Sequence, residues 1–141
     1  MGVAVSAQRL EKMQDAAVYL VEFDPETRAE VQALLSGLPW QVHSYETPRA
    51  LLDSLPRSAW GCVVANVELA DMTIGELLEA LEDRQRMALI LLCRDIEIPD
   101  AVAAMRAGVH DVLQFPVVER ALGQQVSAAI SKLSPDFRIR H

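Results

Sequence analysis

The chain has 141 residues, of which 51% are hydrophobic and 23% charged, and its formal net charge is −7. This length and apolar content fit one globular domain that buries a core of its own. This negative net charge argues against a domain that attracts nucleic acid or anionic lipid electrostatically, because those partners need a basic surface. We therefore expect no direct contact of this domain with nucleic acid or with a membrane.

The sequence also indicates a cytoplasmic protein. No apolar run reaches the ~18 residues that a membrane-spanning helix needs, and the N-terminus lacks a charged start followed by an unbroken apolar stretch. Cys62 and Cys93 lie inside apolar runs. Such positions favour buried, reduced thiols over a disulfide framework.

The first predicted strand, 16–23, reads AAVYLVEF. An apolar run without polar alternation is typical of a strand that is buried on both faces. Asp24 and Pro25 supply the N-cap acid and first-turn proline of a helix, which Gly37 ends. A short strand is predicted next, over 40–45.

The middle of the chain repeats this alternation. A helix begins at Thr47-Pro48 and ends at Pro56. The run GCVVANV predicts a strand over 61–67, and the leucines of 75–81 predict a helix. The run ALILLC predicts a further apolar strand over 88–93.

The last three elements complete the series. Pro99 begins a helix that ends at Ala107-Gly108, a short strand is predicted over 111–114, and the final helix runs from Val118 to Leu133. Five strands that alternate with five helices imply right-handed crossovers, and hence an α/β fold with a doubly wound parallel sheet. In such a sheet the ligand site lies outside the carboxyl ends of the strands, where the strand order reverses.

Three segments resemble the receiver domains of response regulators, and they read VYLVEFDPETR, CVVANVELADM and LILLCRDIEIPDAVAAMRAGVHDVLQFP. The third segment is the most specific, because its strand, helix-starting proline, Ala-Met-Arg-Ala-Gly helix ending and Pro116 recur in order. The resemblance covers about residues 17–131 and is strongest to regulators of the nitrogen-fixation type that precede LuxR-like DNA-binding domains. It implies the flavodoxin-like receiver fold, with a cis peptide bond before Pro116.

The expected division of the chain follows from this range. Residues 1–15 form an N-terminal extension, 16–133 a receiver-like domain and 134–141 a C-terminal tail.

The resemblance also implies that the phosphorylation pocket is degenerate. An active receiver has two acids after its first strand, a phosphoacceptor aspartate after its third, a Ser or Thr after its fourth, and a Lys before the proline. A neutral amide cannot do a carboxylate's nucleophilic work on phosphorus. The corresponding positions here are Glu22, Phe23, Asn66, Cys93, Phe115 and Pro116.

We expect no cofactor, Mg²⁺ included. Phe23 stands where the family has a direct metal ligand, and Asn66 offers an amide where the cation needs a second carboxylate. Glu22, Asp24 and Glu68 remain the candidates for a divalent cation, with solvated loop acids as the default.

Two further hypotheses concern the same edge of the sheet. Phe23 and Phe115 either meet and fill the emptied pocket or pack separately and leave it open. Cys93 is either an inert buried residue or a redox-sensitive thiol.

The function that we expect is phosphorylation-independent protein–protein interaction in bacterial signal transduction or transcription control. The alternative is a receiver that retains weak metal binding, or phosphorylation at a non-standard acid, and switches an associated DNA-binding output. An enzyme is not expected, because no nucleophile–base pair, glycine-rich phosphate loop or metal-ligand set is visible.

The same resemblance implies a surface for homodimerisation or for another protein partner. This surface is made by the helix 99–107, the strand after it and the final helix. The candidate contacts on this face are Val102, Arg106, His110, Val112 and Glu119.

Overall fold

The computed structural model describes residues 15–84, 86–95 and 98–133. Its strands are β1 (Ala17–Val21), β2 (Gln41–Tyr45), β3 (Gly61–Asn66), β4 (Met87–Cys93) and β5 (Asp111–Gln114). Its helices are α2 (Pro25–Leu35), α3 (Pro48–Ser54), α4 (Ile74–Glu82), α5 (Ile98–Ala107) and α6 (Glu119–Leu133). The predicted N-terminal extension, apart from Asp15, and the predicted C-terminal tail lie outside the described residues.

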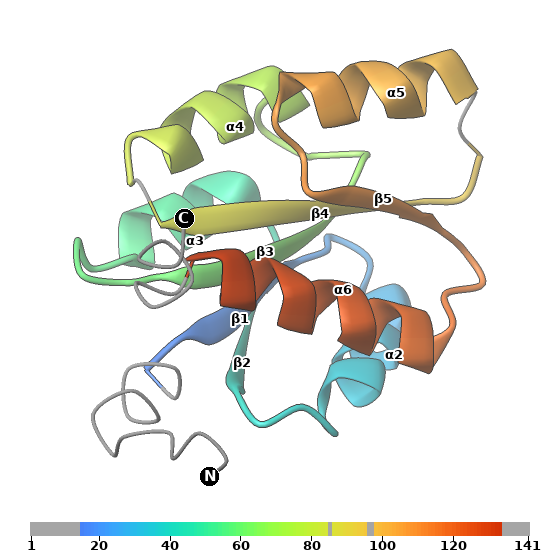
Figure 1. The fold of residues 1–141 in the computed structure, drawn as a ribbon, viewed down its shortest axis with the longest axis horizontal. Helices are drawn as coiled ribbons and strands as arrows, with labels where there is room; N and C mark the ends of the chain where they lie inside the picture. Colours follow the sequence, from blue (N-terminus) through green and yellow to red (C-terminus); the bar gives the residue numbers. More distant parts are fainter. Residues whose placement is uncertain (1–14, 85, 96–97, 134–141) are drawn as a thin grey trace, which may run out of the picture.

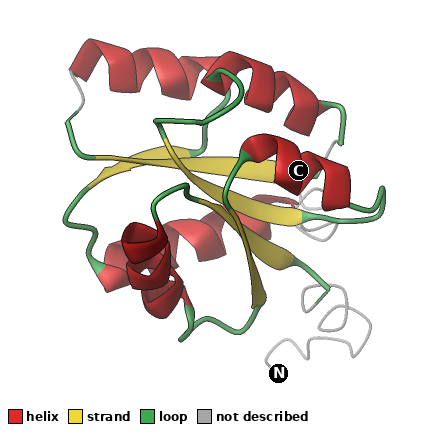
Figure 2. Cartoon of the chain, turned by 180° about the vertical axis from the view of Figure 1, so that it is seen from behind, coloured by secondary structure: helices red, strands yellow, loops and turns green. Residues whose placement is uncertain are grey.

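All five strands are parallel and form one sheet in the order β2-β1-β3-β4-β5. The sheet separates two layers of helices, as Figures 1 and 2 show from opposite sides. α2 and α6 cover one face, and α3, α4 and α5 cover the other. The predicted doubly wound α/β fold is therefore confirmed.

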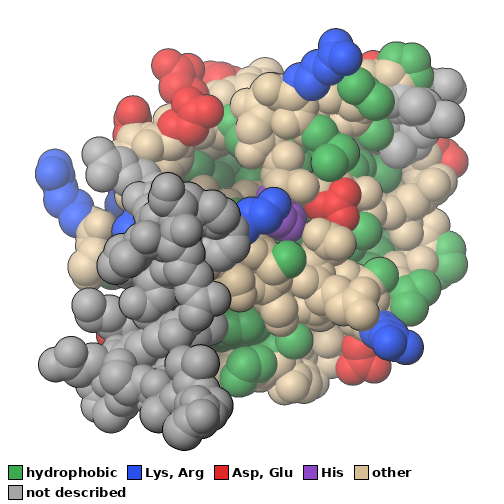
Figure 3. Space-filling model, in the orientation of Figure 1, with side chains coloured by type: hydrophobic (Ala, Val, Ile, Leu, Met, Phe, Trp, Pro, Cys, Tyr) green, Lys and Arg blue, Asp and Glu red, His purple; other side chains and the backbone are tan. Residues whose placement is uncertain are grey.

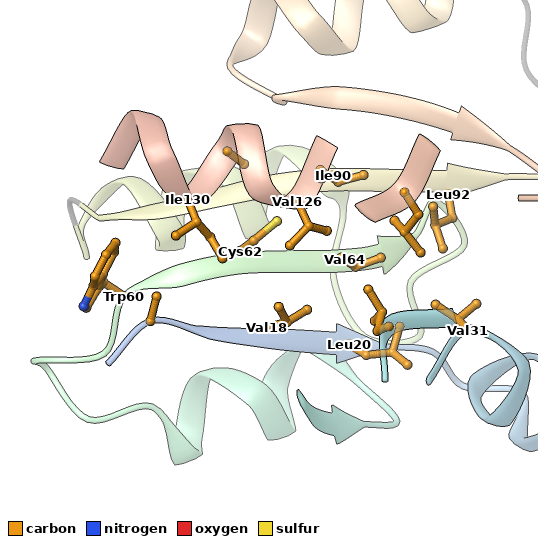
Figure 4. Close-up of a cluster of buried hydrophobic side chains, with 14 residues drawn as sticks. Val18, Leu20, Val31, Trp60, Cys62, Val64, Ile90, Leu92, Val126 and Ile130 are labelled. Atoms are coloured by element: carbon orange, nitrogen blue, oxygen red, sulfur yellow. The ribbon is translucent and has the colours of Figure 1, made fainter. Parts of the chain in front are cut away.

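The interior strand β1, which lies between β2 and β3, shows why the sheet needs both layers. Its residues alternate between two buried clusters: Val18 and Leu20 pack toward α2 and α6, whereas Ala17, Tyr19 and Val21 pack toward the other layer. Figure 4 shows the first cluster, in which side chains of β1, β3 and β4 meet those of α2 and α6. Burying a side chain the size of Val or Leu stabilises the fold by about 1.5–3 kcal/mol, so both faces contribute to stability.

Side-chain caps fix where three of the helices begin. Asp24 accepts from the backbone N–H of Thr27 at the start of α2, and Thr47 does the same for α3 through Ala50. The Asp24 cap was predicted from sequence, and the next helix was predicted to begin at Thr47-Pro48. At α4, Thr73 forms a capping box with Glu76, which satisfies two backbone donors reciprocally.

Gly61 sets the register between β1 and β3 at their amino ends. It lies opposite Ala17, and a Cβ atom at Gly61 would be 1.9 Å from the Ala17 carbonyl oxygen. Its φ is +145°, a backbone angle that residues other than glycine rarely adopt. The pairing continues residue by residue to Val21 and Ala65. The register at Gly61 therefore also determines which residues lie next to each other after the ends of β1 and β3.

Arg86 organises the same amino edge of the sheet. Its guanidinium lies 4.3 Å from the centroid of the Trp60 ring, and its Nη2 donates to the carbonyl oxygen of Leu133 at 3.5 Å. Trp60, labelled in Figure 4 at the amino end of β3, is buried. The end of α6 is thereby tied to the edge where β1 and β3 begin.

Candidate functional site

The carboxyl ends of the strands meet at the point where the strand order reverses, between β1 and β3. Glu22 directly follows β1, and Asn66 ends β3. A pocket of about 330 Å³ opens between them. It is lined by Glu22, Phe23, Asp24, Asn66, Glu68 and Ala70. The structure therefore brings three of the six predicted pocket residues together, and all three predicted cation candidates line one pocket.

Glu22 and Asn66 are joined by a hydrogen bond at the base of this site. Asn66 Nδ2 donates to Glu22 Oε1 at 2.8 Å, and the backbone N–H of Asp24 donates to Glu22 Oε2 at 3.1 Å. Asn66 Oδ1 accepts from the N–H of Glu68 at 2.9 Å, so both ends of the amide are used. Glu22 is only 5% exposed, and each of its carboxylate oxygens accepts a hydrogen bond.

Asp24 is engaged at the start of α2. Its Oδ2 accepts from the hydroxyl of Thr27 at 2.7 Å and from the Thr27 N–H at 2.9 Å. These two bonds, together with the charges of Arg94 and Arg28, hold the pKa of the Asp24 carboxyl below its usual range. Asp24 is thus an ionised helix cap as well as part of the pocket wall.

Arg28 explains why β1 ends before Glu22, although the strand was predicted to reach Phe23. Arg28 Nη1 donates to the carbonyl oxygen of Glu22 at 2.8 Å and to that of Phe23 at 3.4 Å. The carbonyl oxygens are satisfied by a side chain instead of by a neighbouring strand. The chain can therefore turn at Glu22 and place Asp24 as the cap of α2.

The hypothesis that Phe23 and Phe115 fill the pocket together is wrong. Phe23 is 62% exposed at the rim of the pocket. Phe115 is half-buried against the cluster under α2 and α6, and the guanidinium of Arg94 lies 4.8 Å from its ring centroid. The two rings pack separately, which leaves the pocket open. The predicted cis peptide bond between Phe115 and Pro116 is present.

Cys93 ends β4 and is buried. Its Sγ contacts the carbonyl oxygen of Leu113 at 3.6 Å. Burial, and then the charge of Asp95, raise the pKa of the Cys93 thiol. Reactive thiols need a lowered pKa and access to solvent, so this environment favours the inert alternative.

The acids of the site do not form a metal centre as they stand. Over residues 15–84, 86–95 and 98–133, no group of three or more His, Cys, Asp or Glu side chains is arranged to hold a metal ion. Glu22 and Asp24 both accept hydrogen bonds from protein donors.

Also among the described residues, no helix is both long and apolar enough to cross a bilayer.

Comparison with known proteins identifies the fold. Residues 18–127 match the family model of the response regulator receiver domain. The chain belongs to this family. The resemblance that the sequence suggested is confirmed at that level.

Two curated relatives of this receiver domain are regulators of bacteria. The transcriptional regulatory protein FixJ of Bradyrhizobium diazoefficiens is 28% identical over 119 residues, which is 84% of this chain and 58% of the relative. The response regulator protein TodT of Pseudomonas putida is 26% identical over 132 residues, which is 92% of this chain and 58% of the relative. The chain thus spans little more than half the length of either relative.

Solved structures agree with the receiver fold. The structure of full-length FixJ from B. japonicum has a TM-score of 0.77 and 27% identity, and the match covers 87% of this chain and 61% of that one. A response regulator receiver protein from Pseudoalteromonas atlantica has a TM-score of 0.69 and 28% identity, with coverage of 82% and 97%.

Four of the five candidate partner residues of the receiver domain lie on α5, β5 and α6, and His110 lies in the loop before β5. On α5, Val102 is 43% exposed and Arg106 is exposed, and on β5 Val112 is half-buried. Glu119, at the start of α6, lines a groove with Leu34 of α2 and would contact a Cβ atom at Gly37, just after that helix. Figure 3 faces α5, β5 and α6 and shows apolar side chains over α5.

Acid is expected to destabilise the receiver domain through His110. This side chain is half-buried, and its Nε2 has no hydrogen-bond partner among the described residues. Burial, and then the charge of Lys132, lower the pKa of His110, whereas Gln125 and Asp111 oppose that shift. The pKa in the folded state therefore lies below the unfolded value of about 6.5. Since the unfolded chain binds this proton more readily, stability falls as the pH drops below about 6.5.

Urea unfolding at pH values of about 7.5 and 5.5 tests this prediction. The variant His110→Gln should lose less stability between the two pH values than the parent protein does. Every other side chain is the same in both proteins, so the comparison isolates the contribution of position 110. An equal loss in both proteins would contradict the role of His110.

Sequence reasoning did not single out Thr27, Arg28 or Arg94 as site residues. The structure places all three at the carboxyl edge, where they contact Asp24, Glu22 and Phe115. A signal was present for Thr27, which stands three residues after the predicted cap Asp24. The two arginines carry no comparable signal, because their contacts depend on how separate segments meet in the fold.

Proposed function

We propose that this receiver domain acts without aspartyl phosphorylation, by protein–protein interaction in bacterial signal transduction or transcription control. The observation that carries the proposal is the amide of Asn66 at the end of β3, hydrogen-bonded to the buried carboxylate of Glu22. By the family resemblance, position 66 is that of the phosphoacceptor aspartate. A carboxamide does not replace a carboxylate as a nucleophile toward phosphorus. The domain then works as a cytoplasmic binding module and not as an enzyme.

The donor set around the pocket supports the same proposal, because it does not fit a Mg²⁺ ion. This cation takes oxygen ligands in near-octahedral geometry and gives up its water reluctantly. The Glu22 carboxylate oxygens accept hydrogen bonds from Asn66 and Asp24, and Asn66 Oδ1 accepts from Glu68. Phe23, at the family's metal-ligand position, offers only a ring. We therefore propose that the domain binds its partner without Mg²⁺.

An amide NMR titration of the isotope-labelled protein tests the proposal. Mg²⁺ is added first and then beryllofluoride, which mimics an acyl phosphate. We expect an unchanged spectrum, because the pocket has an amide at the nucleophile position and its buried carboxylate, Glu22, already accepts two hydrogen bonds. Saturable shifts around Glu22, Asn66 and Cys93 would overturn the proposal and favour a receiver that still binds metal or a phosphoryl group at a non-standard acid.

We place the partner-binding surface on α5, β5 and α6. The supporting observation is the apolar exposure on α5, where Val102 is 43% and Met105 48% exposed. Exposed apolar side chains that lie together mark interaction sites more often than isolated ones do. The surface is proposed to receive a second copy of the domain or another regulatory protein.

The variant Val102→Glu is expected to weaken self-association by about tenfold or more, because a charge would be buried in an apolar contact. Sedimentation equilibrium measures the dissociation constant. Ala50→Glu is the control, since Ala50 is exposed on α3, outside the proposed surface, and the introduced charge is the same. A dimer that Val102→Glu leaves intact would contradict this surface, and a monomer at all concentrations would exclude the second copy as the partner.

A further inference from the structure

Arg94 connects three segments that follow different strands. Its guanidinium carbon lies 4.8 Å from the centroid of the Phe115 ring, just past the end of β5. Its Nη2 donates to Thr27 Oγ1 in the first turn of α2, at 3.4 Å. Its carbonyl oxygen accepts from Gln114 Nε2 at 2.8 Å. Arg94 directly follows β4, so a single residue joins the ends of β4 and β5 to the start of α2.

The contact over the ring is the stronger of the two side-chain contacts. The hydrogen bond to Thr27 is long, whereas a guanidinium over an aromatic face is attracted by the ring's negative quadrupole. Its planar shape also lets arginine stack where lysine cannot. The contact depends on an aromatic ring at Phe115, where the family resemblance places a lysine that would repel Arg94.

A chain of hydrogen bonds continues from Arg94 into the candidate pocket. Thr27 Oγ1, which accepts from Arg94, donates to Asp24 Oδ2 at 2.7 Å. The N–H of Asp24 donates to Glu22, and Glu22 accepts from Asn66. The end of β5 is thus linked to the end of β3 through protein groups alone.

We propose that Arg94 is a positioning residue that keeps the end of β5 and the pocket in one arrangement without a phosphoryl group. The inference rests on the phosphorylation-independent function proposed above, because these contacts connect the ends of β4 and β5 where a phosphoryl group would otherwise do so. Phe115 also donates its N–H to the Cys93 carbonyl oxygen at 2.7 Å, next to Arg94. β5 belongs to the proposed partner surface, so Arg94 positions that surface as well.

A double-mutant cycle with Arg94→Gln and Phe115→Leu tests the central contact. The two changes should be non-additive, with a coupling of about two- to fivefold in the folding equilibrium constant. Phe115→Tyr keeps an aromatic face and should keep the coupling. Arg49→Gln is the matched control, because Arg49 is exposed on α3 and the charge change is the same. Additive effects of Arg94→Gln and Phe115→Leu would overturn the proposal.

Two NMR readouts separate positioning from a merely local contact. In Arg94→Gln, the Phe115 amide should exchange its hydrogen faster, and the titration midpoint of the Asp24 carboxyl should rise because a nearby positive charge is lost. Arg49→Gln should change neither. If Arg94→Gln alters the NMR signals of the immediate sequence neighbours of Arg94 only, the proposal is overturned.

These outcomes are distinct from failure of the proposed function. Suppose that the protein responds saturably to beryllofluoride and that Arg94→Gln and Phe115→Leu are still coupled. The proposed phosphorylation-independent function would then be refuted, and with it the proposal that Arg94 acts without a phosphoryl group. If the effects of the two substitutions on stability are additive and the spectrum does not respond to beryllofluoride, the role of Arg94 is refuted and the proposed function is not.

Discussion

Replacing Gly61 by alanine is expected to lower the free energy of unfolding by about 3–5 kcal/mol. The new Cβ atom would lie 1.9 Å from the Ala17 carbonyl oxygen, and the φ of +145° disfavours any side chain. The backbone cannot simply move away, because the N–H of Ala17 bonds to the Trp60 carbonyl oxygen and that of Gly61 bonds to the Arg86 carbonyl oxygen. A loss of this size approaches the whole stability of many small domains.

Chemical unfolding of Gly61→Ala measures the effect, and Gly75→Ala serves as its control. Gly75 lies in α4, and the nearest atom to a Cβ there is the Thr73 hydroxyl oxygen at 3.9 Å. That substitution should be neutral or stabilise by up to about 1 kcal/mol. If Gly61→Ala does not accumulate as folded protein while Gly75→Ala does, the prediction is met in its strongest form. Equal stabilities of the two variants would contradict it.

The second large effect is expected from Asn66→Asp. The change replaces the amide that donates to Glu22 at 2.8 Å with a second carboxylate, beside a side chain that is 5% exposed. Two carboxylates this close do not both ionise readily, so one of them takes a raised pKa. Without divalent cations, the free energy of unfolding at about pH 7 should fall by about 2–4 kcal/mol, through the lost hydrogen bond and the repulsion.

The pH dependence has a defined sign. A carboxyl group with a raised pKa in the folded state costs stability as the pH rises, so the deficit of Asn66→Asp should shrink toward about pH 5. Millimolar Mg²⁺ should also reduce the deficit by shielding the paired charges. Asn66→Ala is the control, because it removes the hydrogen bond and adds no charge. A deficit in Asn66→Asp that neither pH nor Mg²⁺ changes would refute this account.

Much of the fold was accessible from local pattern. β5 has the predicted bounds, because a turn precedes it and Phe115-Pro116 follows it. β1 was predicted to begin one residue too early and to end two residues too late, since AAVYLVEF stays largely apolar through Phe23. The strand ends earlier because Arg28 takes the carbonyl oxygens of Glu22 and Phe23. Such a side-chain contact from the following helix leaves no trace in hydropathy.

The candidate site was predictable in position and less so in its contacts. Glu22 and Asn66 were expected at adjacent strand ends, and the register from Gly61 puts them there. Their hydrogen bond could not be foreseen, because it depends on side-chain orientation across 44 residues of sequence. Whether Phe23 and Phe115 meet or stay apart was left open by the sequence, since an apolar residue at a strand end can face the core or the solvent with the same local pattern.

The attachment of α6 to the amino edge has a practical consequence for surface-based binding assays. Leu133 is tied to Arg86, and Asp15 lines the same hollow as Arg86 and Trp60. The first and last described residues therefore both lie at the edge of the sheet opposite the pocket. A sensor chip or bead coupled near either of them would present the Glu22–Asn66 pocket to the flowing analyte.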